Sequence, residues 1–427
     1  MYERKHKMKI LMVGGGGREH ALIKKLKESR YVPEVICAPG NGGISCDARC
    51  FDVSADDKAG MIKLAKNECV DLVFVAPDNP LADGLVDELE AEGIRAFGPS
   101  KAAAQIEASK VFAKNLMKKY NIPTAGYEVF DNANSALKYI KEKNEFPTVI
   151  KADGLAFGKG VIIAQSISEA ETAISSLMED KIFGESGSRI VIEQYITGPE
   201  VSVLAFCDGK TVKPMVSSMD FKRVFDGNIG PNTGGMGNIS PNPYYTDEIA
   251  DICMKKIFAP TVKAMAEEGN PFKGCLYFGL MLTSDGPKVI EYNSRFGDPE
   301  TQVVMPLLKT DLVDIINAVI DEKLDKINIE WENGAAACVI LASGGYPGKF
   351  EKGMIIKGLN KVGEAEGVTV YHAGTKLSSG RFLTSSGRVL GITATAPTVE
   401  KALEIVYDHI GKISFNGMHF RTDIGKC

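Results

Sequence analysis

The first hundred residues alternate short apolar runs with amphipathic segments. The apolar runs predict strands at 8–13, 34–38, 72–76 and, more weakly, 95–97. The segments between them have apolar positions at helical spacing and predict helices at 19–29, 56–67 and 81–92. Short strands separated by amphipathic helices are typical of a parallel sheet that is covered on both faces.

A second unit begins where Pro123 ends the helix that precedes it. Its pattern predicts a strand, a helix, two strands, a helix and a strand, at 126–130, 135–143, 148–152, 160–164, 168–178 and 189–196. Strands and helices then mix around a glycine-dense centre as far as about residue 320. The last part has predicted strands at 336–342 and 389–395 and a helix at 398–410.

These patterns predict a chain of several α/β and α+β domains. An open parallel-sheet domain covers 1–110, and a central domain covers 111–330 and includes a smaller unit at 124–196. A small C-terminal α/β domain covers 331–427. The length of 427 residues agrees, because a domain has roughly 150 residues.

Composition and charge exclude several classes of protein. There are 50 Lys and Arg residues against 55 Asp and Glu, a net charge of −5. This balance argues against a protein that coats nucleic acid, which needs surplus cations to neutralise phosphates. Hydrophobic residues at 44% and charged residues at 25% exclude a disordered or collagen-like chain. No apolar run approaches the roughly 20 residues that span a bilayer, and no secretory signal is found. We expect no nucleic-acid or membrane partner.

The nine cysteines are scattered and form no CxxC pair. Cys46 and Cys50 are the closest two, but no second Cys/His pair follows at zinc spacing. Free thiols are therefore a better interpretation than a structural metal site, and they fit a reducing, cytoplasmic compartment. The sequence leaves a monomer and a small homo-oligomer equally open.

The glycine run 14–17 follows the first predicted strand and precedes a helix. Such a turn is an anion site, because free backbone N–H groups and the helix dipole point at the ligand. A dinucleotide fingerprint fits poorly, since Glu19 or His20 would occupy the position of its third glycine. Two interpretations of the loop remain: it binds the phosphate of a smaller ligand, or it is a purely structural turn. A second loop at 39–43 lies at the same edge of the predicted sheet.

A second glycine loop, 154–160, resembles a Walker A loop but lacks its spacing. Only three residues separate Gly154 from Gly158, and Gly160 stands at the Ser/Thr position that would hold magnesium. What remains is a hairpin tip that carries Lys159, with Lys151 at the end of the preceding strand. Two cations flanking a glycine loop indicate a polyphosphate site.

Two further segments carry candidate chemistry. The region 230–237 has four glycines in eight residues, which lets backbone N–H groups approach a ligand closely. The run 288–293 reads as a strand whose alternation puts Glu291 and Asn293 on one face, with Ile290 and Tyr292 on the other. A carboxylate beside an amide oxygen suits Mg²⁺. Arg295 follows directly and can clamp a carboxylate or phosphate with two hydrogen bonds.

Together, these segments resemble the phosphoribosylamine–glycine ligase (glycinamide ribonucleotide synthetase) family of the ATP-grasp superfamily. The resemblance covers nearly the whole chain in one order. It is carried by 13–21 (VGGGGREHA), 38–41 (APGN), 98–99 (GP), 150–161 (IKADGLAFGKGV), 230–237 (GPNTGGMG) and 291–301 (EYNSRFGDPET). It implies an ATP-grasp fold for the central domain, in which the unit at 124–196 is a small mobile lid. It also implies ATP-dependent ligation of glycine to 5-phosphoribosylamine through glycyl phosphate, a step of purine biosynthesis.

The resemblance also implies a nucleotide site with Mg²⁺, or Mn²⁺ in its place. Lys110 and Lys151 match the lysines that contact the ATP phosphates, and Gly158, Lys159 and Gly160 match the lid loop. The hinge strand that contacts adenine is matched by Glu193, Gln194, Tyr195 and Ile196, and the carboxylate that contacts the ribose is matched by Glu200. Glu291 and Asn293 match the metal ligands.

The remaining implied residues concern the other two substrates. Those placed around glycine and the reacting phosphate are Asp220, Lys222 and Arg295, given catalytic roles, with Asn232, Thr233, Gly234, Gly235 and Asp298. Those that cradle the phosphoribosyl group are Gly16, Gly17, Arg18, Glu19, Pro39, Gly40 and Asn41.

The chain departs from the family pattern at several positions. Phe221 replaces a His or Tyr, which weakens an acid–base role there, and Pro199 leaves the ribose contact to Glu200 alone. Asp78 replaces a glutamate near the sugar site, and Phe157 replaces a small lid residue. The strand at 275–282 has no carboxylate, so we expect phosphate to hold much of one metal ion.

Three alternatives stay open on the sequence. An ATP-dependent carboxylase acting on another ribonucleotide would use bicarbonate in place of glycine. A dinucleotide-dependent oxidoreductase would depend on the 14–17 loop alone. A non-catalytic nucleotide sensor is disfavoured by the complete set of Lys, Glu, Asn and Arg residues.

Overall fold

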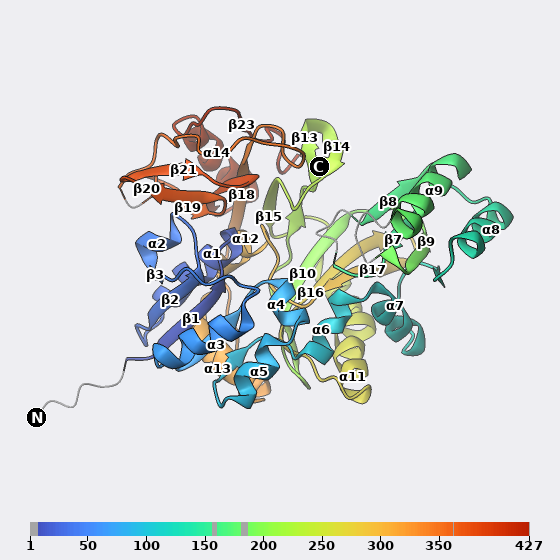
Figure 1. The fold of residues 1–427 in the computed structure, drawn as a ribbon, viewed down its shortest axis with the longest axis horizontal. Helices are drawn as coiled ribbons and strands as arrows, with labels where there is room; N and C mark the ends of the chain where they lie inside the picture. Colours follow the sequence, from blue (N-terminus) through green and yellow to red (C-terminus); the bar gives the residue numbers. More distant parts are fainter. Residues whose placement is uncertain (1–6, 156–159, 181–186, 362, 427) are drawn as a thin grey trace, which may run out of the picture.

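A five-stranded parallel sheet forms the N-terminal part, with strands in the order β3-β2-β1-β4-β5. The computed structural model describes residues 7–155, 160–180, 187–361 and 363–426 (Figure 1). The strands are β1 (Lys9–Gly14), β2 (Glu34–Pro39), β3 (Arg49–Cys50), β4 (Leu72–Val75) and β5 (Ala96–Phe97). The predicted parallel sheet is confirmed.

Both faces of this sheet are covered, as predicted. Ile10 and Met12 of β1 point into one buried core, and Leu11 and Val13 point into another on the opposite side. This alternation follows from the two-residue period of a strand. The helices against the first face are α1 (Gly17–Lys27) and α13 (Leu312–Ile320), and those against the second include α3 (Lys58–Asn67) and α5 (Leu85–Ala91).

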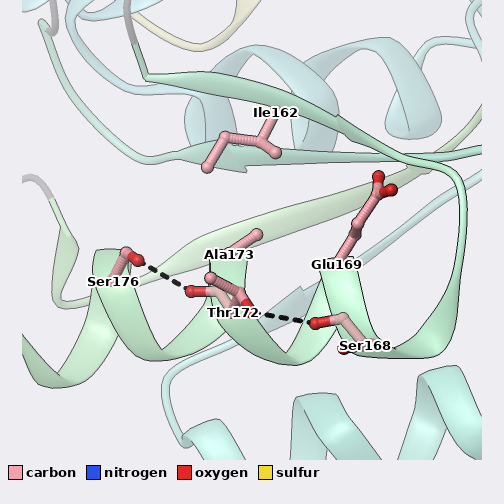
Figure 2. Close-up of a pocket in the computed structure, with 6 residues that line it drawn as sticks. All are labelled: Ile162, Ser168, Glu169, Thr172, Ala173 and Ser176. Atoms are coloured by element: carbon pink, nitrogen blue, oxygen red, sulfur yellow. Dashed lines mark hydrogen bonds between the residues drawn. The ribbon is translucent and has the colours of Figure 1, made fainter.

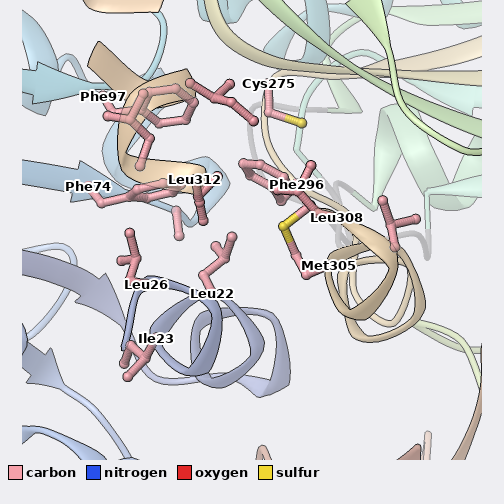
Figure 3. Close-up of a cluster of buried hydrophobic side chains, with 14 of the residues drawn as sticks. Leu22, Ile23, Leu26, Phe74, Phe97, Cys275, Phe296, Met305, Leu308 and Leu312 are labelled. Carbon is pink, nitrogen blue, oxygen red and sulfur yellow. The ribbon is translucent and has the colours of Figure 1, made fainter. Parts of the chain in front are cut away.

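The first of these cores anchors the segment that follows the predicted metal-binding strand. Phe74 and Phe97 stack with ring centroids 4.6 Å apart, and Phe296 lies 6.0 Å from Phe74 (Figure 3). Phe296 is 1% exposed and comes directly after Arg295. The apolar core therefore fixes the backbone that carries this arginine.

The predicted helix at 81–92 is two helices. The first is α4 (Asp78–Ala82) and the second is α5, with Asp83 and Gly84 between them. Glycine is the weakest helix former after proline, so the helix is interrupted there. The break places Asp78 at the first turn of a separate helix.

The central part contains a four-stranded antiparallel sheet in the order β11-β10-β16-β17. Its strands are β10 (Glu200–Asp208), β11 (Val212–Pro214), β16 (Lys273–Thr283) and β17 (Gly286–Asn293). One face packs on helices, and the other joins the core beneath the N-terminal sheet through Leu204 and Phe206. The helices are α6 (Lys101–Ala108), α7 (Lys110–Lys119), α10 (Asp247–Cys253) and α11 (Ala259–Glu267).

The predicted lid is a separate four-stranded sheet in the order β6-β9-β7-β8, which projects from one end of the molecule (Figure 1). Its elements are β6 (Tyr127–Phe130), α8 (Ala133–Lys143), β7 (Thr148–Ala152), β8 (Val161–Ala164), α9 (Ile167–Ile174) and β9 (Ile190–Gln194). The predicted order of elements is confirmed. The helix predicted at 168–178 begins as α9 and continues as a π-helical turn, Ser175–Glu179.

The C-terminal sheet takes strands from the central region. Its main order is β12-β15-β18-β22-β19, with β23 beside β18. The strands are β12 (Met219–Asp220), β15 (Gly237–Ser240), β18 (Ala335–Ser343), β19 (Thr369–His372), β22 (Arg388–Ala396) and β23 (Met418–His419), and α14 (Val399–Ile410) covers them. Two hairpins, β13 (Arg223–Phe225) with β14 (Ile229–Asn232) and β20 (Thr375–Ser378) with β21 (Arg381–Thr384), complete this part.

This arrangement links the predicted domains closely. β15 pairs with β18 so that Asn238 lies opposite Cys338, and α13 of the central region packs under the N-terminal sheet. The limits near 110 and 330 stay predictions. No described helix combines the length and apolar character needed to cross a membrane.

Candidate active site

Glu291, near the end of β17, lies within a group of four cations. Burial disfavours its negative charge, but the cations outweigh this effect and hold the pKa of Glu291 below its usual value. These cations are Lys222, Lys151, Lys110 and Arg295. They come from the turn after β12, from β7, from the start of α7 and from the segment after β17. The fold thus brings together residues that are far apart in the sequence.

Glu291 and Asn293 share one side of β17, as predicted, with Tyr292 buried on the other. The expectation for Ile290 is wrong, because the register between β16 and β17 shifts there: Gly279 pairs with Glu291 but Leu280 pairs with Val289. The bulge puts Val289, in place of Ile290, in the core with Tyr292. Such a bulge re-aims neighbouring side chains.

The side chains of Glu291 and Asn293 form a donor set that fits a hard divalent cation. The Glu291 side chain is 39% exposed. Asn293 donates from Nδ2 to the Tyr292 carbonyl at 2.8 Å, so its Oδ1 is the atom left as a ligand. A carboxylate and an amide oxygen are ligands that Mg²⁺ accepts. The residues therefore fit the predicted metal.

Lys222 connects two predicted roles. Its Nζ lies 3.0 Å from Glu200 Oε2 and 3.6 Å from Glu291 Oε1. Burial opposes its charge, yet the Glu200 and Glu291 carboxylates raise the pKa of Lys222 well above its usual value. The lysine stays protonated and joins the predicted ribose carboxylate to the predicted metal ligand.

The predicted phosphate lysines lie at the junction of lid and body. Lys151 Nζ donates to the Ile290 carbonyl at the bulge, 3.1 Å away, and Lys110 Nζ donates to the Gly154 carbonyl at 2.8 Å. Burial lowers the pKa of Lys110. Of the predicted lid residues, Gly160 accepts at its carbonyl from Ala152 N at 2.9 Å, whereas Phe157, Gly158 and Lys159 lie outside the described residues.

The predicted hinge residues straddle the end of β9. Glu193 is paired on both sides within the lid sheet, and Gln194 N donates to the Gly126 carbonyl at 2.8 Å. Tyr195 and Ile196 follow the last residue of the strand, and Tyr195 is 39% exposed. Gln194 pairs with Thr148 at the start of β7, so Tyr195 and Ile196 continue the chain beyond that end of the lid sheet.

The Glu193 side chain has a second role that the sequence did not indicate. Its carboxylate is 3% exposed and lies 2.9 Å from Lys114 Nζ and 3.0 Å from Lys151 Nζ. Lys114 was not among the predicted residues, because it reads as one of several lysines on an amphipathic helix. The spacing of four from Lys110 is the signal that places both lysines on one face of α7.

Asp220 has a second carboxyl group near it. Burial raises the pKa of Asp220 well above its usual value, and the neighbouring Glu300 adds to the shift. Glu300, which is 5% exposed, accepts from the Ser202 hydroxyl at 3.4 Å. Among the described residues, Asp220 Oδ1 is buried and has no hydrogen-bond partner. This oxygen is free to accept a hydrogen bond from a ligand, and a cationic donor would favour the ionised form of the carboxyl group.

Phe221 points away from the two charged residues beside it. Its side chain is 3% exposed and belongs to the C-terminal core. The guanidinium of Arg421 lies 5.3 Å from its ring centroid. The departure from the family at this position therefore affects packing within the C-terminal part.

Arg295 is held by a residue that sequence reasoning missed. Its NH2 lies 3.0 Å from Glu107 Oε1, and NH1 donates to the Phe296 carbonyl at 3.2 Å. Glu107 also accepts from the backbone N and the hydroxyl of Ser294, at 2.8 and 2.9 Å. Burial opposes the charge of Arg295, but Glu107 and Asp78 raise the pKa of the guanidinium above its usual value.

The two N-terminal loops are packed tightly on each other. A Cβ at Gly15 would lie 2.4 Å from the Gly40 carbonyl oxygen, so only glycine fits. Asn41 donates from Nδ2 to the carbonyls of Gly15 and His372, at 3.0 and 2.7 Å. Pro39 precedes this contact and is exposed. The loops thus form one rigid unit at the carboxyl edge of the sheet.

At the start of α1, where an anionic ligand was predicted, the Glu19 carboxylate already accepts a hydrogen bond from the backbone. Glu19 Oε2 accepts from Gly16 N at 2.5 Å, and its Oε1 accepts from Arg18 Nε at 2.6 Å. Gly17 lies beside Gln302 and Asp298. The Glu19 side chain is 2% exposed, so its main observed role is to cap the helix.

Asp298 joins the N-terminal loop to the C-terminal part. Arg18 N lies 3.4 Å from its Oδ2, and so does Arg388 NH2. Arg388, from β22, also donates to the carbonyl of Asp298 at 2.7 Å and to that of Gly234. No motif marked Arg388, which reaches the loop across 154 residues of chain.

The predicted loop after β14 lies against these groups. Asn232 ends β14, and Thr233 donates from its hydroxyl to the Lys222 carbonyl at 2.8 Å. Gly235 N donates to the Thr233 hydroxyl at 2.9 Å. The loop is thereby tied to the backbone of Lys222. Arg388 donates to the carbonyls of Gly234, Gly235 and Asp298, so it connects the glycines of the loop to Asp298.

Other parts of the described chain offer weaker candidates for a functional site. Within the described part of the chain, no three His, Cys, Asp or Glu side chains are grouped as a metal site, and all eight cysteines there are free. A hollow of about 310 Å³ on the lid is lined by Ile162, Ser168, Glu169, Thr172, Ala173 and Ser176 (Figure 2). The Thr172 and Ser176 hydroxyls donate to carbonyls of their own helix, and none of these residues belongs to the site above.

Comparison with known sequences gives matches over almost the whole chain. Family profiles described as Phosphoribosylglycinamide synthetase match in order: the N domain at 8–107, the ATP-grasp (A) domain at 108–301 and the C domain at 336–427. The phosphoribosylamine–glycine ligase of Caldanaerobacter subterraneus subsp. tengcongensis is 48% identical over 417 residues, 98% of this chain and 99% of the relative. That of Brucella melitensis biotype 1 is 48% identical over 418 residues, covering 98% and 97%.

Comparison with solved structures agrees with the sequence matches. The phosphoribosylamine–glycine ligase of Thermotoga maritima has a TM-score of 0.83 at 32% identity, covering 97% of this chain and 100% of that one. The biotin carboxylase domain of a Hydrogenobacter thermophilus 2-oxoglutarate carboxylase, in complex with MgADP and bicarbonate, has a TM-score of 0.75 at 17% identity, covering 97% and 92%. The second likeness shows a shared fold alone.

Proposed function

This chain belongs to the phosphoribosylamine–glycine ligase family, and we infer from that membership that it joins glycine to 5-phosphoribosylamine at the expense of ATP. It is an ATP-grasp ligase of purine biosynthesis. The family, fold class and enzyme class predicted from the sequence are confirmed. The finer assignments below are our proposals.

One observation supports the placement of the reaction: the charges of four cations from separate elements act on the Glu291 carboxylate, and Lys222 Nζ lies 3.6 Å from its Oε1. A triphosphate is the ligand that needs such a group, because phosphoryl transfer depends on positioning and charge neutralisation. In our proposal Lys110 and Lys151 bind its phosphates. The backbone of 193–196 contacts adenine and Glu200 contacts the ribose, so Lys222 leaves Glu200 when nucleotide binds.

Glu291 and Asn293 would hold Mg²⁺, and we propose Mn²⁺ as a substitute. When bound, the metal would supply positive charge that neutralises the charge developing on the phosphates. A second ion would depend mainly on phosphate oxygens, since β16 offers no carboxylate beside Glu291.

We place glycine between Asp220 and Arg295. The free Asp220 Oδ1 is suited to the glycine ammonium, and Arg295 and Lys222 are suited to carboxylate and phosphate oxygens. A glycine carboxylate oxygen attacks the γ-phosphorus, the bond from that phosphorus to the bridging oxygen of ADP breaks, and glycyl phosphate forms. The loop with Asn232, Thr233, Gly234 and Gly235, together with Asp298, would close this pocket.

The second step forms the amide. The amine nitrogen of 5-phosphoribosylamine attacks the glycyl carbonyl carbon, the carbon–oxygen bond to phosphate breaks, and the nitrogen loses a proton. We propose that the N-terminal loops present the phosphoribosyl group, through Gly16, Gly17, Pro39 and Gly40. Arg18, Glu19 and Asn41 would act there mainly by holding the loops in place, given their contacts.

The intermediate must be kept from water, because an acyl phosphate hydrolyses when exposed. The lid with Gly158, Lys159 and Gly160 is the proposed cover. We further propose that the enzyme works in the cytoplasm as a monomer or small homo-oligomer. The free thiols support a reducing compartment.

The decisive test uses ATP, Mg²⁺, glycine and freshly prepared 5-phosphoribosylamine. Phosphate release should require both the amine and glycine, and hydroxylamine should trap the acyl phosphate as glycine hydroxamate. Bicarbonate-dependent ADP release that ignores glycine would replace this proposal with the carboxylase alternative.

A further inference from the structure

A buried row of three charged side chains crosses the base of the lid. It runs from Lys114 on α7 through Glu193 on β9 to Lys151 on β7. The Glu193 carboxylate lies 2.9 Å from Lys114 Nζ and 3.0 Å from Lys151 Nζ. The Lys114 and Glu193 side chains are both 3% exposed, and that of Lys151 is 11% exposed.

The two lysines are anchored differently. Lys114 donates to the Thr124 hydroxyl at 2.8 Å, which in turn donates to the Val289 carbonyl at 2.7 Å. Its Nζ also lies 5.6 Å from the centre of the Tyr127 ring. Besides Glu193, Lys151 contacts the Ile290 carbonyl. Lys114 is fixed inside the body, whereas Lys151 stands at the edge of the nucleotide site.

A single buried carboxylate thus has two cationic partners. Removing the last partner of a buried charge is costly, because the charge is left without compensation in a medium of low dielectric constant. Lys151 can move away from Glu193 at a low cost only if another cation stays. Lys114 is that cation.

We propose that Lys114 is a positioning residue for nucleotide binding: it keeps the Glu193 carboxylate compensated, which frees the Lys151 ammonium to move to the phosphates of ATP. The inference rests on the proposed function, since it takes Lys151 as a phosphate ligand. It gives a role to a residue that does not itself touch the nucleotide.

The removal of Lys114 should therefore weaken nucleotide binding through Lys151. In Lys114→Met, the Glu193 carboxylate would depend on Lys151 alone and would hold it. Replacing the carboxylate as well, in Lys114→Met/Glu193→Gln, would release Lys151 again. A residue needed only for packing would not show this rescue.

The test measures the dissociation constant of a non-hydrolysable MgATP analogue by isothermal titration calorimetry. We expect Lys114→Met to bind at least tenfold more weakly and the double variant to return to within threefold of wild type. Lys118→Met is the matched control, because Lys118 lies on the same helix and 5.8 Å from the same Tyr127 ring but is exposed. It should bind as wild type does.

Steady-state kinetics give a second readout. KM for ATP should rise in Lys114→Met while KM for glycine stays unchanged, and the double variant should reverse the rise. Should Lys114→Met fail to fold, Lys114→Gln and the double variant replace it, with folding followed by circular dichroism. Equal affinity in wild type and the single variant, or no rescue in the double variant, overturns the inference. Failure of the wild type to bind the analogue overturns the proposed ATP site itself.

Discussion

Glu107 and Arg295 form a largely buried ion pair, with the guanidinium NH2 3.0 Å from the carboxylate and side chains that are 18% (Arg295) and 6% (Glu107) exposed. The pair spans two parts of the fold, since Glu107 belongs to α6 and Arg295 follows β17. The same carboxylate accepts from Ser294, so it fixes both the arginine and the backbone that carries it. The orientation of a proposed catalytic residue therefore depends on a helix outside the site.

Glu107→Gln should impair both stability and catalysis. The guanidinium loses its counter-ion in the interior, and breaking a buried pair costs about 3 kcal/mol. We expect urea unfolding to show this loss and turnover to fall by about tenfold or more through misplacement of Arg295. Glu322→Gln is the comparison, because its pairs with Lys210 and Lys273 are at the surface; it should cost less than about 1 kcal/mol. Equal losses in both variants would contradict the assignment.

Glu291→Ala should abolish ligation and leave the fold intact. The side chain is 39% exposed and serves the proposed metal site more than the core. We expect turnover to fall by at least about 100-fold, with an unchanged melting temperature. Any residual activity of the variant should need a higher Mg²⁺ concentration than that of the wild type, because one metal ligand is lost. Wild-type turnover in Glu291→Ala would contradict the assignment of Glu291 as a metal ligand.

Gly15→Ala should disturb the N-terminal loops. The added methyl group would meet the Gly40 carbonyl at 2.4 Å, so one loop must shift, at a cost of about 1–3 kcal/mol. We expect KM for 5-phosphoribosylamine to rise while that for ATP changes little. At Gly411 a Cβ would meet nothing within 4 Å, and Gly411→Ala should leave both values unchanged. A rise in KM for ATP in Gly15→Ala would contradict the assignment of these loops to 5-phosphoribosylamine.

Phe221→His tests whether position 221 has an acid–base role. The ring lies in the C-terminal core beneath Arg421, so an imidazole would replace buried apolar surface. We expect a loss of about 1–3 kcal/mol in the free energy of unfolding, with turnover within a factor of about three. A clear gain in turnover, or a new pH dependence, would show that the side chain reaches the reaction.

Stability should fall as the pH drops from 6.5 toward 3. The imidazole of His372 is 1% exposed, and burial, reinforced by His20, lowers its pKa to about 3. In that window the unfolded chain binds a proton that the folded chain does not, so stability rises with pH by at most about 1.4 kcal/mol per unit. Urea unfolding at pH 7.5, 6.0 and 5.0 measures the slope. His372→Asn should reduce it, and an unchanged slope would exclude His372 as its source.

The strands, and the shared side of Glu291 and Asn293 on β17, could be predicted because their signals are local. Apolar runs and glycine turns marked the sheets, and a period of two placed Glu291 and Asn293 on one side of β17. The bulge at Ile290 was missed, because it arises from the pairing with β16 rather than from the strand's own sequence.

Residues that act from a distance left no such signal. Glu107 lies in an alanine-rich helix with no motif around it, and its contact with Ser294 spans 187 positions. Lys114 and Arg388 likewise appear as ordinary surface cations until the tertiary structure buries them against carboxylates or backbone carbonyls. Their roles come from neighbours that only folding supplies.

The sharing of β12 and β15 with the C-terminal sheet has a consequence for engineering. Asp220 is the last residue of β12, so a designer who grafts a foreign C-terminal module onto residues 1–330 would remove the scaffold on which that carboxylate is mounted. Viable chimaeras should instead exchange the two strands together with the module. Fragments divided at 330 should regain activity only when they are mixed.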